Sequence, residues 1–171
     1  MSCRELNEED VVSLAALAMW NAVDVRYIEL MPLGCGKHFH GIPTDEILEK
    51  LEKEYGKATP VVKRCGNGPA RYYEFDNFEG RIGFISPMSH KFCSECNRVR
   101  LTAEGRIKLC LHYDTGIELK PLLRGGYSDE EIQTAILEAV NQKPKAHKFA
   151  QETAENTVEN SDSRRMVQIG G

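Results

Sequence analysis

The sequence predicts an α+β fold, and three observations support this. Several segments repeat apolar residues at the helical period and begin or end at capping residues. Three short segments rich in β-branched and aromatic residues are separated by Gly and Asn, as in an antiparallel meander. A lone strand followed by a helix near the N-terminus is typical of the end of a larger α/β unit. The chain has 171 residues, 41% of them hydrophobic and 28% charged, so it can bury a core without disulfides.

The first predicted helix covers residues 7–20, with Asn7 as its N-cap. Its apolar face holds Val11, Leu14, Ala15 and Ala18. A strand rich in β-branched and large residues follows at 23–31 and ends at a Pro-Leu-Gly run. A Gly-rich loop is expected over 33–42.

A second helix is predicted from Thr44 to the residue before Gly56. Its apolar stripe consists of Ile47, Leu48, Leu51 and Tyr55. Three strands are expected next, at 59–64, 70–76 and 81–86. The Gly and Asn residues between them favour antiparallel pairing. The strand at 23–31 has no obvious partner before residue 59.

Residues 98–110 predict a β-hairpin whose loop is Ala103-Glu104-Gly105, with Gly105 at a positive φ. The resulting register pairs Leu101 with Ile107, Val99 with Leu109, and Arg98 with Cys110. Strand alternation puts Val99 and Leu101 on an apolar face that can pack on a core. The opposite face carries Arg98, Arg100, Lys108 and the Cys110 thiol.

Two helices are predicted after the hairpin, a short one over 118–124 and a longer one over 128–142. Ser128 and Glu131 have the spacing of a capping box at the start of the longer helix. Its inward face is expected to hold Ile132, Ala135, Ile136, Ala139 and Val140. Residues 151–163 are acidic and polar, which is typical of a flexible, solvated segment.

Charge is unevenly placed along the chain, whose net charge is −4. Residues 81–110 carry six Lys or Arg against two Glu, a net of +4. This basic island indicates a small anionic partner, whereas the overall charge argues against a general nucleic-acid binder. An apolar run of about 20 residues, which a membrane helix needs, is missing, and so is a signal-peptide pattern. We therefore expect a cytoplasmic protein that makes no membrane contact.

The six cysteines indicate a metal site more than a disulfide framework, because three of them are clustered and no secretory signal accompanies them. Cys93 and Cys96 form C-x2-C, and Cys110 returns beside them through the hairpin. Structural zinc would need a fourth ligand, which His90 or His112 could supply. A [4Fe–4S] cluster would keep one iron open for a substrate atom.

The spacing alone favours zinc, while the two arginines on the thiolate face favour a cluster that binds a phosphorylated substrate. The simpler interpretation is that both arginines lie on a solvent-exposed strand face and bind no ligand. A second group, Cys35, His38 and His40, lies in the Gly-rich loop and is more simply read as incidental.

The segment FCSECNRVRLTAEGRIKLCL at 92–111 is similar to the C-terminal cluster motif of the GTP 3′,8-cyclase (MoaA) family. These are radical S-adenosylmethionine enzymes that begin molybdenum cofactor biosynthesis. Three further stretches resemble the family, namely VRYIELMPLG at 25–34, ISPMSHKFCSECNR at 85–98 and the terminal RRMVQIGG. Together they span almost the whole chain in the family's order.

The resemblance implies a lyase that uses two [4Fe–4S] clusters. The N-terminal cluster binds S-adenosylmethionine and generates a 5′-deoxyadenosyl radical, and the C-terminal cluster binds GTP through its open iron. The product is (8S)-3′,8-cyclo-7,8-dihydroguanosine 5′-triphosphate. The implied domains are a remnant of a partial (βα) TIM-type barrel at 1–34, a cluster- and GTP-binding domain at 35–150, and a flexible tail at 151–171.

The family's functional residues carry over to matching positions. The implied cluster ligands are Cys93, Cys96 and Cys110. The implied GTP-binding residues are Arg98, Val99 and Arg100. The implied contact to S-adenosylmethionine is Met31, and Arg26, on the opposite strand face, is a weaker candidate. The terminal Gly170 and Gly171 are the implied catalytic residues that reach the active site.

The major departure from the family is the missing C-x3-C-x2-C motif. We therefore expect a C-terminal half that is inactive alone. The expected partners are GTP, the N-terminal radical half, the downstream cyclic pyranopterin monophosphate synthase, and a second copy in a homodimer. The competing hypothesis is a non-catalytic zinc-ribbon assembly module.

Overall fold

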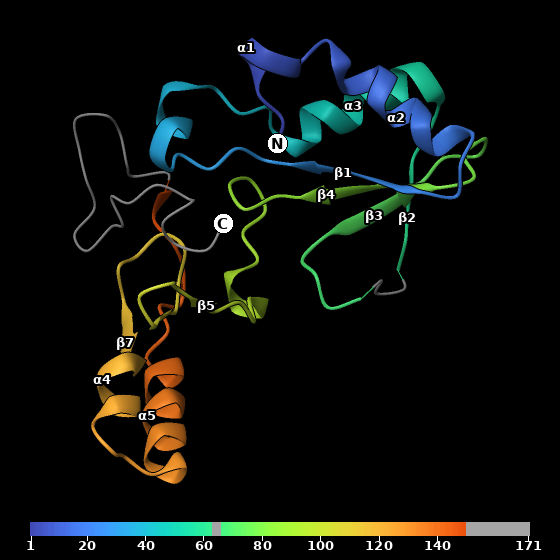
Figure 1. Ribbon diagram of the computed structural model, residues 1–171. Helices are drawn as coiled ribbons and strands as arrows, with labels where there is room; N and C mark the ends of the chain where they lie inside the picture. The colour runs from blue at the N-terminus through green and yellow to red at the C-terminus, as the bar shows by residue number, and fades with distance from the viewer. Residues whose placement is uncertain (63–65, 150–171) are drawn as a thin grey trace. The chain divides into compact units, whose positions relative to one another are not determined.

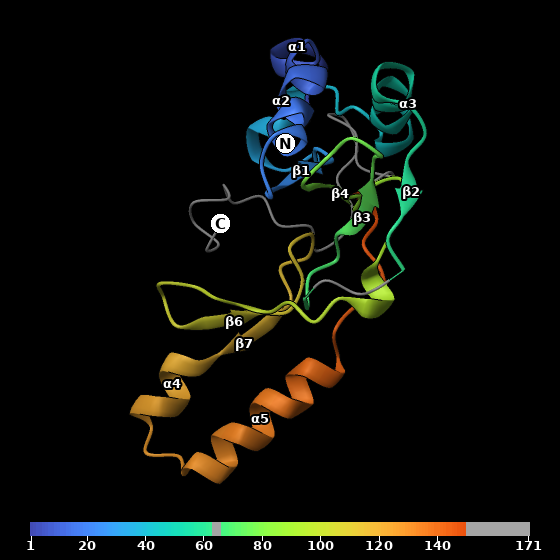
Figure 2. The same ribbon diagram turned by 90° about the vertical axis from the view of Figure 1, so that its right-hand side faces the viewer.

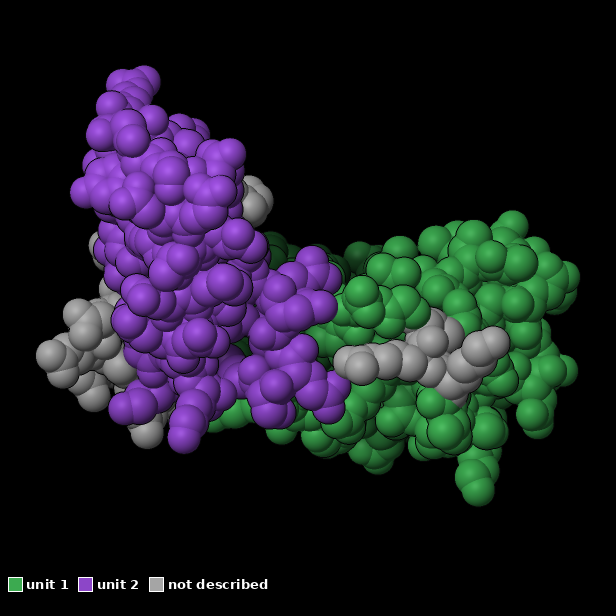
Figure 3. Space-filling model, turned by 90° about the horizontal axis from the view of Figure 1, so that it is seen from below, with its two compact units in different colours: residues 1–31, 38–92 green, residues 32–37, 93–171 purple. Residues whose placement is uncertain are grey.

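The computed structural model describes residues 1–62 and 66–149, which form two compact units. Unit 1 consists of residues 1–31 and 38–92, and unit 2 of residues 32–37 and the chain from residue 93 onward (Figure 3). The family resemblance implies different limits, 1–34, 35–150 and 151–171, which divide the chain by function. These limits stay a prediction. Each unit has its own sheet.

Unit 1 contains a four-stranded sheet in the order β1-β4-β3-β2 (Figure 1). The strands are β1 Asp24–Ile28, β2 Thr59–Pro60, β3 Arg71–Glu74 and β4 Arg81–Ile85. The antiparallel meander of β2, β3 and β4 is confirmed. The sequence offers β1 no partner before residue 59. In the structure β1 pairs in parallel with β4, and Tyr27 lies opposite Phe84. The mixed α+β class is therefore confirmed.

Three helices lie over one face of this sheet (Figures 1 and 2). They are α1 Arg4–Asn7, α2 Asp10–Met19 and α3 Thr44–Tyr55. The helix α3 has the predicted bounds and is followed by Gly56 at φ 91°. The helix predicted over 7–20 is confirmed as α2, although it begins three residues later than predicted, after a separate short helix α1. Asn7 does not cap α2, since it ends α1 and its Oδ1 accepts the Cys3 N–H at 2.8 Å.

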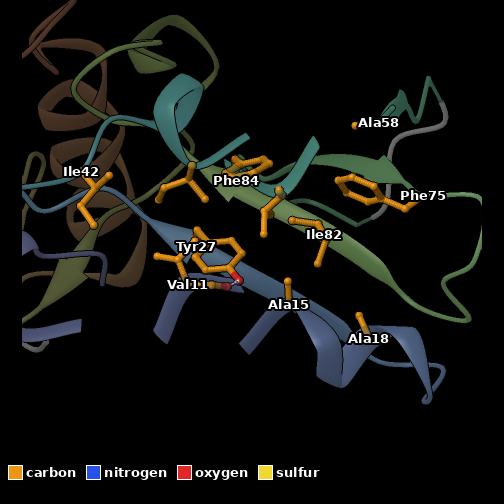
Figure 4. Packing of buried hydrophobic residues seen from close by; sticks show 11 residues of the cluster. Val11, Ala15, Ala18, Tyr27, Ile42, Ala58, Phe75, Ile82 and Phe84 are labelled. Carbon is orange, nitrogen blue, oxygen red and sulfur yellow. Dashed lines mark hydrogen bonds between the residues drawn. The ribbon is translucent and has the colours of Figure 1, made fainter. Parts of the chain in front are cut away.

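The core of unit 1 fills the space between α2, α3 and the sheet (Figure 4). The buried face of α2 consists of Val11, Ala15 and Ala18. Its small alanines let the helix approach Tyr27, whose hydroxyl donates to the Val11 carbonyl at 2.6 Å. Leu14, expected on the same face, is 43% exposed. Burying each large residue such as Ile82 or Phe84 contributes about 1.5–3 kcal/mol to folding.

Unit 2 contains a three-stranded antiparallel sheet in the order β5-β6-β7. The strands are β5 Arg100–Leu101, β6 Arg106–Lys108 and β7 Gly116–Glu118. Leu101 pairs with Ile107 in the register that the sequence predicts, and Gly105 has φ 88° in the loop. Short 3-10 turns occur at η1 Gly34–His38 and η2 Cys93–Glu95.

The predicted burial of the hairpin faces is wrong. Val99 and Leu101 are 48% and 64% exposed, while Lys108 is only 1% exposed. A lysine can be buried in this way because its stem is apolar and its ammonium finds a carbonyl. The Lys108 Nζ donates to the Tyr113 carbonyl at 2.8 Å, which satisfies that condition.

Two helices complete the described part of unit 2, α4 Leu119–Arg124 and α5 Asp129–Asn141. The capping box is confirmed, because Ser128 Oγ accepts the Glu131 N–H and the Glu131 carboxylate accepts the Ser128 N–H. The predicted inward face of α5 is only half covered, and Val140 is 37% exposed. Among the described elements α5 contacts α4 and β7, too little surface to bury a whole helix face.

The predicted tail at 151–171, with Gly170 and Gly171, lies outside the described residues, as does Cys65. Across 1–62 and 66–149 no helix is long and apolar enough to span a bilayer.

Candidate metal and nucleotide site

The C-x2-C segment folds as a tight turn in unit 2. The 3-10 turn Cys93–Glu95 is closed by the Cys96 N–H, which donates to the Cys93 carbonyl at 3.2 Å. Both cysteines are free thiols of intermediate exposure. A three-residue spacing across such a turn brings two sulfurs toward one side, as the sequence predicts for a metal site.

The third thiol follows β6 directly. The described pairing ends at Arg100 and Lys108, so the predicted pairing of Arg98 with Cys110 stays a prediction. Cys110 is likewise a free thiol of intermediate exposure. Unit 2 therefore carries all three predicted ligands on a turn and a hairpin that are linked by residues 97–99.

The donor chemistry of these residues fits an iron–sulfur cluster or zinc, since both take thiolate ligands and all three thiols are free. Across the described ranges, however, no three His, Cys, Asp or Glu side chains converge closely enough to hold a metal ion. The ligand set of Cys93, Cys96 and Cys110 therefore stays a prediction.

Arg98 and Arg100 lie between the turn and the hairpin loop. Arg98 is exposed and Arg100 half-buried, with the exposed side chain of Val99 between them. In the described part of the chain neither guanidinium enters an ion pair. Arg106 on the next strand differs, because it is held by Glu118 at 3.1 Å and Asp114 at 3.5 Å. The Arg98–Arg100 pair is therefore open to an external anion.

Lys143 is a residue of this site that sequence analysis missed. Its Nζ donates to the Cys96 carbonyl at 2.7 Å and to the Arg98 carbonyl at 2.8 Å. The same Nζ lies 3.5 Å from Cys96 Sγ. The one sequence signal was its place directly before Pro144, at the end of a predicted helix.

Glu29 in unit 1 was also missed. It lies just after β1, two residues before Met31, and is 4% exposed. Its carboxylate accepts the backbone N–H groups of Thr44, Met88 and Ser89 at 2.8–3.0 Å, and the Ser89 hydroxyl as well. Burial alone would raise the pKa of Glu29, but these hydrogen bonds outweigh it and lower the pKa below its usual value.

The other predicted ligands have different surroundings. His112 is fully buried among rings, 4.3 Å from Tyr113 and 4.4 Å from Phe149 between centroids. His90 Nε2 lies 3.0 Å from Asp45 Oδ1. His40 Nδ1 pairs with Glu5, and this hydrogen bond lowers the pKa of Glu5 to about 2. Within the described residues His38 and His40 join no metal-binding group.

Fold and site together define a class: an α+β protein that presents three free thiols and two unpaired arginines within a short stretch of one unit. The sequence model of the Molybdenum Cofactor Synthesis C family matches residues 23–149. The chain belongs to this family.

Curated relatives carry the name GTP 3′,8-cyclase. The chain is 42% identical to the protein of Clostridium perfringens strain 13, over 98% of this chain and 50% of the relative. It is 40% identical to that of Syntrophomonas wolfei, over 98% and 51%, and 37% identical to that of Pelotomaculum thermopropionicum, over 98% and 50%. The chain thus spans about half the length of these relatives and corresponds to their C-terminal half.

Proposed function

We propose that this chain is the GTP- and [4Fe–4S]-binding C-terminal part of a GTP 3′,8-cyclase. Such an enzyme converts GTP to (8S)-3′,8-cyclo-7,8-dihydroguanosine 5′-triphosphate, which a cyclic pyranopterin monophosphate synthase would then use. Membership of the molybdenum cofactor family and the names of the relatives support this assignment. The observation that carries it is the pair of unpaired arginines between the C-x2-C turn and Cys110.

Cys93, Cys96 and Cys110 would hold the cluster, since each is a free thiol of unit 2. A [4Fe–4S] cluster with three thiolate ligands keeps one iron open to a substrate atom. The protein's own part is to supply thiolates from a turn and a hairpin, and metal binding would bring them together.

Arg98 and Arg100 would bind the triphosphate. They are two residues apart where the chain enters β5, and the alternation of an extended segment would put their side chains on one face. Guanidinium groups bind phosphate oxygens through two parallel hydrogen bonds, which fixes orientation as well as charge. Val99, 48% exposed between them, would offer apolar contact to the nucleoside.

Met31 would contact S-adenosylmethionine just beyond the end of β1. Support comes from Glu29, whose buried carboxylate ties this end of the strand to the start of α3 and to the backbone at Met88 and Ser89. Residues fixed in this way lose little entropy when a ligand binds. Gly170 and Gly171 would reach the active site from the tail.

The partner would be an N-terminal half that carries the C-x3-C-x2-C motif. In the described residues the outer edge of β1 meets only Ser2, at a single bridge to Glu29. A strand edge presents N–H and C=O groups that can pair with a strand of another chain. On α2, which packs on β1, Leu14 and Leu17 are 43% and 53% exposed, and Trp20 just after it is 74% exposed. A strand–helix unit would cover both, completing a partial (βα) barrel, and the chain alone would be inactive.

Anaerobic reconstitution with iron and sulfide tests this proposal on the 171-residue chain. About four irons per chain, a broad absorbance near 400 nm and GTP binding by calorimetry would support it. A colourless protein that holds one zinc tightly and ignores GTP would favour a zinc-ribbon assembly module instead.

A further inference from the structure

We propose that the segment 143–149, called here the clasp, is a positioning element that restrains the two ligand-bearing parts of unit 2, which metal binding would bring together. Lys143 fixes the cysteine turn, and His147 with Phe149 fixes the chain just after Cys110. This inference rests on the proposed function and names a role for residues that the predicted site does not contain.

The first contact is the Lys143 ammonium against the turn. Its Nζ donates to the carbonyls of Cys96 and Arg98 at 2.7 and 2.8 Å, from 47 and 45 residues away. One charged donor thus ties the backbone of a proposed cluster ligand to that of a proposed phosphate ligand. Hydrogen bonds to charged donors are stronger than neutral ones, so the turn is held firmly.

The second contact is the packing of His147 and Phe149 against His112. The ring centroid of Phe149 lies 4.4 Å from that of His112 and 4.6 Å from that of His147. His112, His147 and Phe149 are 0%, 8% and 2% exposed, so this cluster is a closed core. His112 follows Cys110 by two residues, and the packing therefore restrains the strand end that bears the third thiol.

A seven-residue segment thus contacts both ligand-bearing parts, which the hairpin also joins. Restraining them before metal binding reduces the ordering cost that the cluster would otherwise meet. Lys143 Nζ also lies 3.5 Å from Cys96 Sγ, within reach of a hydrogen bond to a ligand sulfur. Hydrogen bonds to cluster sulfurs are among the factors that set the reduction potential.

The test compares Lys143→Met, Lys143→Arg and the control Lys145→Met in the full chain. Lys145 is exposed and two residues further along the same segment. Removing an outer contact of a metal ligand typically weakens metal binding by roughly 10- to 100-fold. Lys143→Met should lose the cluster to a chelator at least tenfold faster and lower its reduction potential. Lys143→Arg should recover most of both, and Lys145→Met should match the wild type.

Hydrogen exchange of the iron-free chain gives a second readout. Lys143→Met should speed amide exchange over residues 93–98, and Phe149→Leu should speed it over 110–113. Equal cluster retention, potential and exchange in Lys143→Met and Lys145→Met would overturn the clasp while the proposed function stands. A wild-type chain that takes up no cluster would overturn both.

Discussion

Glu29 is a buried carboxylate whose donors come from two distant places in the chain, the start of α3 and the backbone at Met88 and Ser89. No periodicity in the sequence marks such a residue, because its partners are set by tertiary contacts. The roles of Arg98 and Arg100 rest on strand alternation, a local pattern, and stay a prediction. Lys143 was not predicted either, because its hydrogen-bond partners are also set by tertiary contacts.

Replacing Glu29 by Gln should destabilise unit 1 by about 1–3 kcal/mol at neutral pH, because the amide leaves buried N–H donors unsatisfied. The pKa of Glu29 is lowered in the folded protein, so its stabilisation is full above the unfolded value. It is lost as the pH falls through the folded value. Urea unfolding should therefore show the wild-type advantage shrinking below about pH 4.5.

The matched control is Glu49→Gln at an exposed site on α3. A stability difference between Glu29→Gln and the wild type that stays constant from pH 7 to acid would contradict this assignment.

Replacing Arg98 or Arg100 by Ala should weaken GTP binding by about 1–3 kcal/mol, the scale of a charged hydrogen bond. Iron content after reconstitution should not change. Arg124→Ala is the control, since this exposed arginine lies in α4, away from the cysteine turn in sequence. Calorimetry on the reconstituted chain measures the effect, and unaltered affinity in the Arg98/Arg100 double variant would rule out the phosphate role.

Among the elements, the β5–β6 hairpin shows how far local rules reach. Its loop and its Leu101–Ile107 register could be predicted, because turn chemistry and alternation determine them. Which face of the hairpin is buried could not be predicted, since packing against β7 and the rest of unit 2 determines it. The start of the first predicted helix was misplaced for a different reason, because the Asn7 side chain accepts the Cys3 N–H in α1 and does not cap α2.

Gly116 in β7 offers a test of the hairpin sheet. A Cβ added there would lie 2.0 Å from the Ile107 carbonyl oxygen, so β7 must move away from β6. Gly116→Ala should therefore cost unit 2 about 1–3 kcal/mol and lower its cluster content. Gly68→Ala, with nothing within 4 Å of the added Cβ, should be neutral in the same denaturation experiment. Equal midpoints for both variants would show that the sheet does not need this close approach.

At the scale of the whole molecule, the two units have different proposed roles. Unit 2 contains the thiols and arginines, and unit 1 presents the open edge of β1 beside the apolar surface of α2. The class of fold could be predicted from patterns within segments. The parallel pairing of β1 with β4 could not, because 52 residues separate Ile28 from Arg81 and no local signal links them.

An N-terminal half supplied as a separate chain, taken from the Clostridium perfringens relative, should bind this chain through unit 1. Leu17→Asp should weaken the complex at least tenfold, because it puts a charge where about 1.5–3 kcal/mol of apolar burial is expected. Leu137→Asp, on the equally exposed α5, should leave binding unchanged. Sedimentation of the mixed chains measures this, and identical affinity for both variants would place the docking surface elsewhere.

The central claim is that a cluster held by Cys93, Cys96 and Cys110 receives GTP on this chain. Electron paramagnetic resonance of the reduced, reconstituted protein tests it most directly, because the spectrum responds to a ligand on the open iron. We predict a [4Fe–4S] signal that changes when GTP is added and that is lost or unstable when any of the three cysteines becomes Ser, while Cys3→Ser and Cys35→Ser retain it. A signal that is indifferent to GTP, or that survives loss of Cys110, would contradict the account.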